Sequence, residues 1–323
     1  MSANTKSYAD LQRALQGVAR GDQAVSEELY GQVTALHEQW PGQVCLTPHL
    51  FTIFCSQNKP TTKADADKKI QTIEKCMSFS QNSTNVQMWK DYADFVDSLE
   101  TTADWTQNDK DAKMKAVLDR ATECVGHTRL DSACIWIKYI DFETTRNNIT
   151  LVNLLCYMAV QTPFNGDDSK NVLAKYEGIL NNLFEKIFQE ITQADGQDGS
   201  SQIPDRYKSQ QAELVKLITG QFRGEKDAFI DHIKKVVVTQ AEAKAQAREP
   251  YEKSLQGSPA LKDWQAYITF EESQGEFKRV TQLYERAMGS TLELQNDFAL
   301  WMKYAEFIQD KLKDVSLMRA KFE

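Results

Sequence analysis

The apolar positions of this chain follow one short motif, Trp-x-x-Tyr-x-x-Phe, in which three aromatic residues are spaced three positions apart. Residues at i, i+3 and i+6 fall within an arc of roughly 120° on an α-helix, so each copy forms one apolar stripe. Each copy therefore predicts a helix with one buried face. The four copies are Trp89/Tyr92/Phe95, Trp136/Tyr139/Phe142, Trp264/Tyr267/Phe270 and Trp301/Tyr304/Phe307.

A second amphipathic pattern follows the motif after a short polar break. Residues 277–288, with Tyr284 among them, place apolar side chains at three- and four-residue spacing, and residues 114–121 repeat this pattern. We name the aromatic helix "helix A" and the following one "helix B"; an antiparallel pair makes one repeat. Weaker copies are a helix A with Phe51 and Phe54, its helix B at 70–76, a helix B at 151–158, and a further helix A around Tyr176.

The helix pairs recur at a spacing of about 40 residues, which is typical of stacked helical repeats. The sequence therefore predicts an all-α fold, a right-handed superhelical solenoid of antiparallel helix pairs over residues 1–323. We expect regular repeats in 1–165 and in 258–323. Between them, 166–257 predicts irregular, longer helices with a flexible loop at 194–203, where small and polar residues gather.

Capping residues mark several expected helix ends. Thr47-Pro48 and Ser258-Pro259 place a hydroxyl before a proline, an arrangement that favours a helix start. Gly126 and Gly289 follow helix B segments, where a left-handed residue is favoured. The sequence stops at Glu323 inside an expected helix B, so we expect a longer array from which this is the N-terminal half.

Composition supports a folded helical protein and argues against several partners. The chain has 41% hydrophobic and 26% charged residues, with 14 glycines and 7 prolines, too few for the frequent turns of a β fold. Its net charge of −8 disfavours non-specific binding of a polyanion such as RNA. Six cysteines without a C-x-x-C pair, and no apolar leader, indicate a reducing compartment and no membrane partner.

Candidate chemical sites are weak, and we expect no enzyme activity, cofactor or metal. Asp167-Asp168 lacks the second acidic cluster that a Mg²⁺-diphosphate site needs, and favours a helix N-terminus instead. Cys124 and His127 have ligand-like spacing without a second pair. The aromatic triplets lack the basic neighbours of base-stacking platforms.

Two further features could contact a partner, but a structural role is expected for each. We expect Trp105 to fold back onto its own helix pair, and the basic group Lys234, Lys235, Lys244 and Arg248 to be a solvated helix face.

The helix Trp264-Gln-Ala-Tyr267-Ile-Thr-Phe270-Glu271, followed by one that ends Tyr284-Glu-Arg-Ala-Met288, resembles the half-a-TPR (HAT) repeat of RNA-processing scaffolds. The resemblance covers about 20–165 and 245–323, with Phe51 and Phe54 departing from the usual tryptophan. Within that family, residues 250–252, 263–271, 300–304 and 311–315 are similar to the N-terminal HAT region of the U4/U6 snRNP recycling factor of animals.

The resemblance implies a non-catalytic protein–protein scaffold in pre-mRNA splicing. Its implied partners are spliceosomal snRNP proteins and ubiquitin-specific proteases, and its implied location is the nucleoplasm, with shuttling to the cytoplasm. U6 RNA would bind to RNA-recognition motifs that follow the array, and a homodimer would form through later HAT repeats. The alternative is an RNA-binding solenoid of another complex, such as the U1 snRNP or the 3′-end processing machinery.

Overall fold

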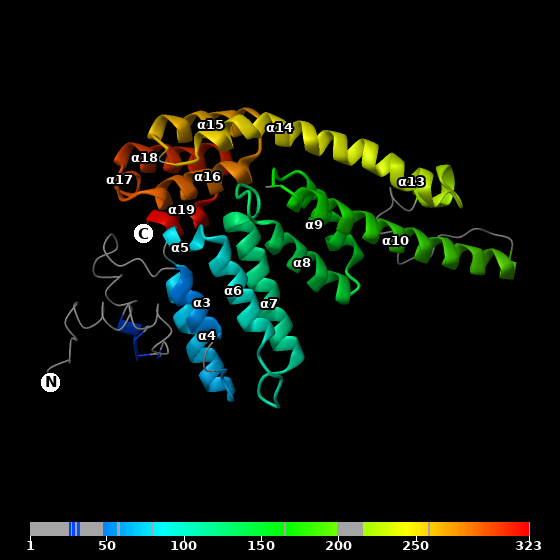
Figure 1. The fold of residues 1–323 in the computed structure, drawn as a ribbon, viewed down its shortest axis with the longest axis horizontal. Coiled ribbons are helices and arrows are strands. Elements are labelled where there is room, and N and C mark those ends of the chain that lie inside the picture. Colours follow the sequence, from blue (N-terminus) through cyan, green and yellow to red (C-terminus); the bar gives the residue numbers. More distant parts are fainter. Residues whose placement is uncertain are drawn as a thin grey trace. The chain divides into compact units, whose positions relative to one another are not determined.

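The computed structural model describes residues 48–322 apart from 57–58, 79, 165, 199–215 and 258, together with 26, 28–29 and 31–32 (Figure 1). These described residues form helices and turns without a strand, so the predicted all-α fold of helix pairs is confirmed. The chain divides into two compact units. Unit 1 joins Met1–Val125 to Ala260–Glu323, and unit 2 is Gly126–Pro259.

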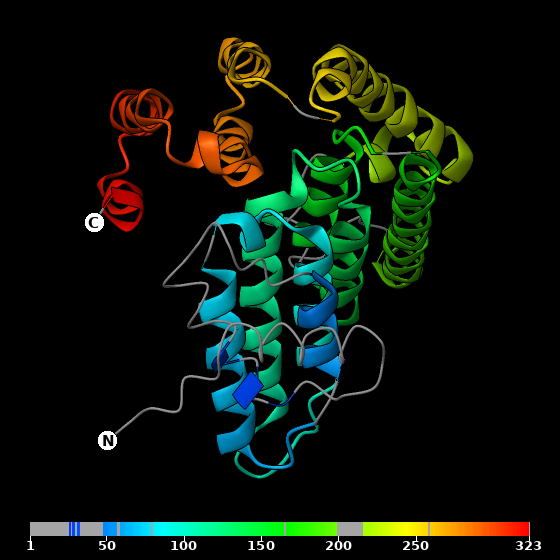
Figure 2. The same cartoon turned by 60° about the vertical axis from the view of Figure 1, so that its left-hand side comes forward.

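The N-terminal stretch of unit 1 contains the first two helix pairs. Helix α6 packs against both α3 and α7, so these elements run side by side in a bundle (Figures 1 and 2). The apolar faces predicted for both B helices are buried, with Ile73 and Leu118 at their centres. The helices of this stretch are α3 (Pro48–Ser56), α4 (Lys63–Met77), α5 (Ser80–Ser83), α6 (Val86–Asp97), α7 (Gln107–Ala121) and the π-helical turn η1 (Thr122–Gly126).

The C-terminal stretch of unit 1 repeats the same A and B order. Helix α15 pairs with α16, and α16 in turn contacts α18; Figure 2 views these helices nearly end-on. The helices are α15 (Leu261–Ser273), α16 (Phe277–Ser290), α17 (Leu292–Gln295), α18 (Phe298–Phe307), η4 (Ile308–Leu312) and α19 (Val315–Phe322).

The two stretches of unit 1 are joined through α16. This helix packs against α5, and the Gln282 side-chain amide donates a hydrogen bond to the Thr122 carbonyl at 3.0 Å and another to the Glu123 carbonyl. Gln282 is buried, so the amide satisfies backbone acceptors that would otherwise be left without partners at the end of α7. A helix B from one stretch therefore completes the packing of the other.

Unit 2 holds one regular helix pair and a set of longer helices. Helix α10 packs against α8, α9 and α13, and Tyr176, the expected anchor of a further helix A, is buried in it with its hydroxyl 3.1 Å from Asn153 Oδ1. The helices are α8 (Ala133–Thr145), α9 (Ile149–Val160), α10 (Asp168–Asp198), η2 (Leu217–Gln221), α13 (Lys226–Ile233), η3 (Lys234–Val238) and α14 (Thr239–Ser254).

The flexible loop expected at 194–203 is only partly covered by the described residues. Residues 194–198 are helical and end α10, so this part of the prediction is wrong, and 199–203 lie outside the described residues. A helix of 31 residues tolerates its two glycines, Gly178 and Gly196, because each costs only about 1 kcal/mol relative to alanine. The division into 1–165, 166–257 and 258–323 concerned the regularity of the repeats and stays a prediction.

The predicted aromatic anchors of the repeats are mostly buried, as a stripe that faces the partner helix should be. Phe95, at the end of its triplet, is 3% exposed, and Tyr139, in the middle of its own, is 2% exposed. The Lys69 ammonium lies 4.9 Å from the ring centroid of Phe95 and joins α4 to α6 at this point. The buried anchors are Phe51, Phe54, Trp89, Tyr92, Phe95, Trp136, Tyr139, Trp264, Tyr267, Tyr284, Tyr304 and Phe307.

Three of the predicted anchors, Phe142, Phe270 and Trp301, are only half-buried. Phe142 and Phe270 occupy the last position of the triplet, at the edge of the 120° arc, where a ring meets the rim of the helix pair. The Arg146 guanidinium lies 3.4 Å from the ring centroid of Phe142 and covers its outer face. The last position of the triplet is therefore a core position in the Trp89 repeat, where Phe95 is buried, and a rim position in the Trp136 and Trp264 repeats.

In three of the four triplets the tryptophan that begins helix A fixes the preceding connection by a hydrogen bond from its indole, whereas the Trp264 indole N–H has no partner among the described residues. Trp89 donates to the Ser83 carbonyl, the last residue of α5, and Trp301 donates to the Gln295 carbonyl, the last residue of α17, both at 2.7 Å. Trp136 donates to the Gly126 carbonyl at the same distance. The tryptophan thus buries a large ring and satisfies a backbone acceptor in one residue, which explains why this position is aromatic and carries a donor.

Two left-handed residues lie at a turn between helix A and helix B. Asn147 (φ 58°) follows α8, and Gly275 (φ 71°) follows α15. The expectation for Gly126 and Gly289 is wrong, because neither has positive φ: Gly126 lies in η1 and Gly289 inside α16. Pro48 does begin α3, as expected.

The expected start of the helix at Ser258-Pro259 is displaced. Helix α15 begins at Leu261, and its N-cap is Ala260, whose backbone N–H donates to Asp263 Oδ2 at 2.9 Å. The carboxylate of the third helical residue thus satisfies the N–H of the N-cap, which is one half of a capping box, while Ala260 has no side-chain acceptor for the other half. Ser258 itself lies outside the described residues.

Glu74 joins the first two repeats through three donors. Its carboxylate accepts from Tyr92 Oη at 2.6 Å and from Lys113 Nζ at 2.7 Å, and it also pairs with Arg120. Burial raises the pKa of the carboxyl, but the hydrogen bonds from Lys113, Tyr92 and Arg120 outweigh it and hold the pKa at about 2. The helix B carboxylate at the equivalent place in the later repeat, Glu285, accepts from Tyr304 Oη at 3.0 Å.

Candidate protein-docking grooves

The candidate sites taken from the sequence are accounted for by local structure. Asp168 begins α10, and Asp167 pairs with Lys170 at 2.7 Å on the exposed first turn, as the helix-start interpretation predicted. His127 packs edge-on against Trp136, with ring centroids 5.2 Å apart. Trp105 is buried, which confirms that it folds back rather than forming an exposed hot spot.

The basic group in the irregular region is not a solvated helix face throughout. Arg248 is only 2% exposed and its guanidinium lies 3.4 Å from the Gln161 carbonyl, while Lys244 Nζ donates to Gln161 Oε1 at 3.0 Å. Lys234 pairs with Glu177 at 2.9 Å. The expectation is therefore wrong for Arg248, because this side chain fastens α14 to the end of α9 instead of facing solvent.

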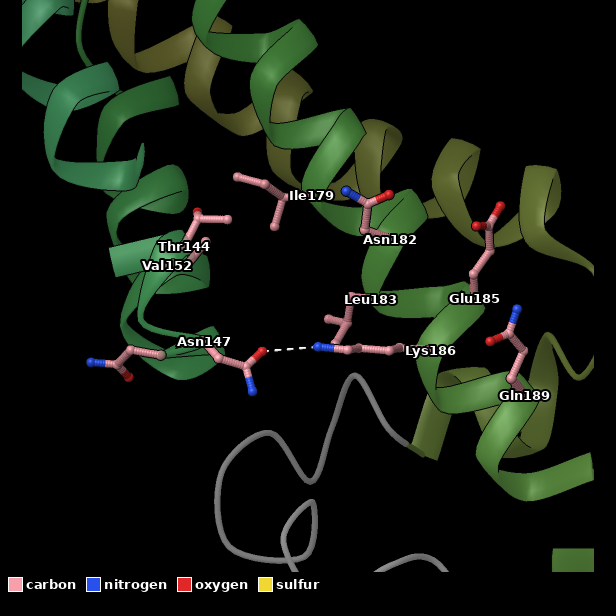
Figure 3. Close-up of a pocket in the computed structure, with 10 residues that line it drawn as sticks. Thr144, Asn147, Val152, Ile179, Asn182, Leu183, Glu185, Lys186 and Gln189 are labelled. Atoms are coloured by element: carbon pink, nitrogen blue, oxygen red, sulfur yellow. Dashed lines mark hydrogen bonds between the residues drawn. The ribbon is translucent and has the colours of Figure 1, made fainter. Parts of the chain in front are cut away.

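Two hollows lie between consecutive A helices, where the repeat leaves a furrow. The first, which we call the α8–α10 groove, has a volume of about 350 Å³ and is formed by the α8–α9 turn and α10 (Figure 3). Figure 3 shows Lys186 reaching from α10 to Asn147, with Ile179 of the same helix lying toward Thr144 and Val152. Its lining residues are Thr144, Asn147, Asn148, Val152, Ile179, Asn182, Leu183, Glu185, Lys186 and Gln189.

The charged groups of the α8–α10 groove already have partners within unit 2. Lys186 Nζ donates to Asn147 Oδ1 at 2.9 Å across the groove (Figure 3), and Glu185 pairs with Lys226 at 2.8 Å. The remaining polar lining is made of amides and one hydroxyl. This groove can offer uncharged hydrogen-bond donors and acceptors around an apolar floor of Val152 and Leu183.

The second hollow, the α15–α18 groove, has a volume of about 310 Å³ and lies within the C-terminal stretch of unit 1. Helix α15 forms one wall of this groove, and α18 with η4 forms the other. Tyr284 of α16 contributes to its floor. Its lining residues are Gln265, Ile268, Thr269, Glu272, Tyr284, Lys303, Glu306, Phe307, Asp310 and Lys311.

Most of the predicted anchors take no part in either groove. Tyr284 and Phe307 line the α15–α18 groove, whereas Phe95 and Tyr139 line neither groove and are enclosed in the cores of their helix pairs. The aromatic triplet is thus a feature of the core, as expected, and the grooves are lined mainly by polar positions on the outer faces of the same helices.

Tyr284 is the central residue of the α15–α18 groove. Its ring is stacked on Tyr304 with centroids 4.9 Å apart and is tilted against Phe307 at 5.9 Å, and the residue is only 4% exposed. In the part of the chain that the structure describes, the phenolic hydroxyl has no hydrogen-bond partner. Burial raises the pKa of Tyr284, and the carboxylates of Glu272 and Glu306 raise it further, so both carboxylates act on this hydroxyl.

The charged side chains that line the α15–α18 groove are unpaired among the described residues. Glu272 comes from one wall, and Glu306 and Asp310 come from the other. Lys303 and Lys311 lie about one helical turn before and after Phe307. The groove therefore has an acidic centre over an aromatic floor, with a lysine toward each end.

These grooves could not be found from the sequence. Tyr284 was predicted as a buried anchor, which is confirmed, but Glu272 and Glu306 lie on different helices and carry no shared local signal. Among the described residues no group of three or more His, Cys, Asp or Glu side chains is placed to hold a metal ion. No helix in the described part is long and apolar enough to cross a membrane.

Comparison with known proteins finds two matching family models. One, described as the PRP39 N-terminal HAT repeat, matches residues 54–177, and the other, described as the PRP39 C-terminal HAT repeat, matches residues 244–323. Together they cover more than half of the chain. The stretch between the two matches coincides with the longer helices of unit 2.

A curated relative is similar over a short stretch. Pre-mRNA-processing factor 39 of Schizosaccharomyces pombe is 39% identical over 61 residues, which are 18% of this chain and 10% of that protein. The matched part thus spans about a tenth of the relative's length.

Proposed function

The chain is a HAT-repeat protein, and from this premise we propose that it acts in the nucleus as a non-catalytic scaffold for proteins of pre-mRNA splicing. The observation that carries the proposal is the match of both PRP39 HAT models to the helix pairs, supported by the relative named pre-mRNA-processing factor 39. Grooves between A helices, at different points along the array, let such a protein spread its contacts over several repeats.

The test is a pull-down from nuclear extract with the immobilised chain, with and without RNase, followed by mass spectrometry. We expect spliceosomal snRNP proteins to be retained after RNase treatment, because the contacts are between proteins. Loss of every snRNP protein on RNase treatment would contradict a protein scaffold and favour the RNA-binding alternative.

A finer assignment within splicing is re-formation of the U4/U6 di-snRNP. It is supported by the similarity of residues 250–252 and 263–271 to the U4/U6 recycling factor. That assignment brings ubiquitin-specific proteases, U6 RNA and a homodimer as further partners, and shuttling to the cytoplasm. The same mass spectra separate it from a U1 snRNP or 3′-end processing protein, because the U4/U6 proteins would be recovered in the first case and the U1 or cleavage proteins in the others.

A further inference from the structure

We propose that the α15–α18 groove is a docking site for a protein segment that inserts an arginine side chain between Glu272 and Glu306, above Tyr284. The inference deepens the proposed scaffold function and rests on it, since it assigns a chemical class to one partner. It concerns only residues within the C-terminal stretch of unit 1.

The first step is the unsatisfied hydroxyl of Tyr284. The ring of this residue is buried, but its hydroxyl opens onto the groove and has no hydrogen-bond partner from the protein among the described residues, so a ligand there can bond to it. Stacking against Tyr304 and Phe307 holds the ring, so the hydroxyl cannot turn toward another helix. A ligand in the groove would supply the missing hydrogen bond.

The second step is the charge around that hydroxyl. Glu272 on α15 and Glu306 on α18 approach it from opposite walls and have no ion-pair partner in the described part of the chain. The two carboxylates repel each other, and a cation placed between them is attracted to both, so the total interaction becomes favourable. The site therefore favours a positively charged group.

The third step distinguishes arginine from other cations. A guanidinium is planar and has five N–H donors, so it can donate to both carboxylates and to the Tyr284 oxygen at once, whereas an ammonium is a compact point charge. The aromatic rings of Tyr284 and Phe307 in the groove suit a flat cation.

The ends of the groove restrict the segment further. Lys303 and Lys311 are each four residues from Phe307, about 6 Å along the helix. Their ammonium groups would repel a run of basic residues and would favour acidic residues on either side of the arginine. Asp310, next to Lys311, weakens this preference for acidic residues at one end of the groove. A nucleic-acid phosphate would meet the carboxylates at the centre, which disfavours RNA as the occupant.

The experiment is selection of random twelve-residue peptides, displayed on phage, on the full chain. Parallel selections use the double variant Glu272→Gln/Glu306→Gln and the control Glu293→Gln, which removes an exposed carboxylate on α17 outside the groove. Neither set of variants removes a hydrogen bond or ion pair of the described structure. Thermal melting first confirms that each variant is folded.

We expect peptides with one arginine flanked by acidic residues to be enriched on the wild-type chain and on Glu293→Gln, and not on the double variant. The best peptide, labelled and titrated by fluorescence anisotropy, should bind the double variant about tenfold or more weakly. It should bind Tyr284→Phe about fivefold more weakly, since one neutral hydrogen bond is lost. Replacing its arginine by citrulline, which has the same shape without the charge, should abolish binding.

The proposal is overturned if no arginine is enriched, if the double variant selects the same peptides, or if citrulline binds as well as arginine. Displacement of the selected peptide by oligouridine RNA from the wild-type groove would also overturn it, because the occupant would then be a nucleic acid. If the pull-down retains snRNP proteins while this selection fails, the scaffold function stands and only the groove assignment is lost.

Discussion

The α8–α10 and α15–α18 grooves occupy the same place in the repeat, between one helix A and the next, yet they differ in what their charges do. In the α8–α10 groove, Lys186 is bonded to Asn147 and Glu185 is paired with Lys226. In the α15–α18 groove, Glu272 and Glu306 are unpaired among the described residues and flank the unpartnered Tyr284 hydroxyl.

The difference shows how the same kind of repeat can form one groove whose charges are already paired and another whose charges are available to a partner. The helix pair fixes the position and depth of the hollow through its buried aromatic anchors. Whether the hollow holds unsatisfied groups then depends on a few side chains at its walls, which the fold does not require. The residues that stabilise the repeat are thus different from the residues that would bind a partner.

The largest expected effect concerns two buried anchors of the helix pairs that also carry a groove. Trp136→Ala and Trp264→Ala should each lower the free energy of unfolding by about 3–5 kcal/mol, because both indoles are almost fully buried. The measurement is the urea midpoint of each variant. A wild-type midpoint for Trp264→Ala would mean that the aromatic anchor does not stabilise this helix pair, and the assignment of stability to the anchors would be wrong.

Glu74 extends the comparison to a carboxylate whose partners are all internal. Glu74→Gln should lower the free energy of unfolding by about 1–3 kcal/mol, since it replaces one of the two acceptor oxygens by a donor and removes the charge that pairs with Lys113 and Arg120. The folded-state pKa of about 2 lies below the ordinary 4.5, so the stabilisation is present above pH 4.5 and is lost as the pH falls toward 2.

Urea denaturation of the wild-type protein and of Glu74→Gln across this pH range measures the effect. The two curves should differ most above pH 4.5 and converge near pH 2. Equal stability at neutral pH would show that the Glu74 contacts contribute nothing to the junction of the first two repeats.

The turn at the end of helix A gives a smaller effect. Gly275→Ala should lower stability by about 1–2 kcal/mol, because a Cβ is strained at φ 71° even with open space around it. Asn147→Gly, at the corresponding turn beside the α8–α10 groove, relieves the strain of a side chain at φ 58° but removes the acceptor of the exposed Lys186, so stability should stay within about 1 kcal/mol of wild type. Thermal melting of the pair tests this, and an unchanged Gly275→Ala would mean that the turn relaxes to another conformation.

The smallest effect separates paired from unpaired carboxylates. Glu177→Gln should lower stability by up to about 1 kcal/mol, because it breaks the half-exposed ion pair with Lys234. Glu272→Gln and Glu306→Gln should leave stability within about 0.5 kcal/mol of wild type, since neither loses a partner. A loss for Glu272→Gln equal to that for Glu177→Gln would show a hidden structural role and weaken the contrast between the grooves.

The core of the repeats could be predicted from sequence because it depends on periodicity. The triplet from Trp89 to Phe95, Tyr139 in the next triplet and the helix B around Leu118 are buried as expected, since a 3.6-residue period leaves only one face for apolar side chains. Helix ends were predicted less well: Gly126, expected as a left-handed residue just past a helix B, lies within the turn η1, and α15 begins at Leu261 with Ala260 as its N-cap.

The grooves could not be predicted, because their chemistry depends on distant pairs. Glu272 and Glu306 are 34 positions apart, and nothing local indicates that they face one tyrosine. The same reason explains the error for Arg248, whose contact with Gln161 lies 87 positions away. From sequence alone, a charged residue in a helical pattern is predicted to face solvent, because its contact with a residue far away in the chain is not known.

The contact of Gln282 with the end of α7 has a consequence for the order in which the protein folds. In a simple array each repeat meets only its neighbours and can fold as soon as it is made. Gln282 instead reaches a carbonyl 160 positions earlier. The entropy of closing so long a loop rises only with the logarithm of its length, but contacts of this separation slow folding.

During synthesis the chain emerges from its N-terminus at about 5–20 residues per second. Helices α5 and α7 are then complete long before α16 exists, and the surface that α16 covers stays exposed to water and to other chains during that interval. Unit 1 therefore finishes folding only after unit 2 has been made, and the junction between α5 and α16 is where a chaperone would have its longest opportunity to bind.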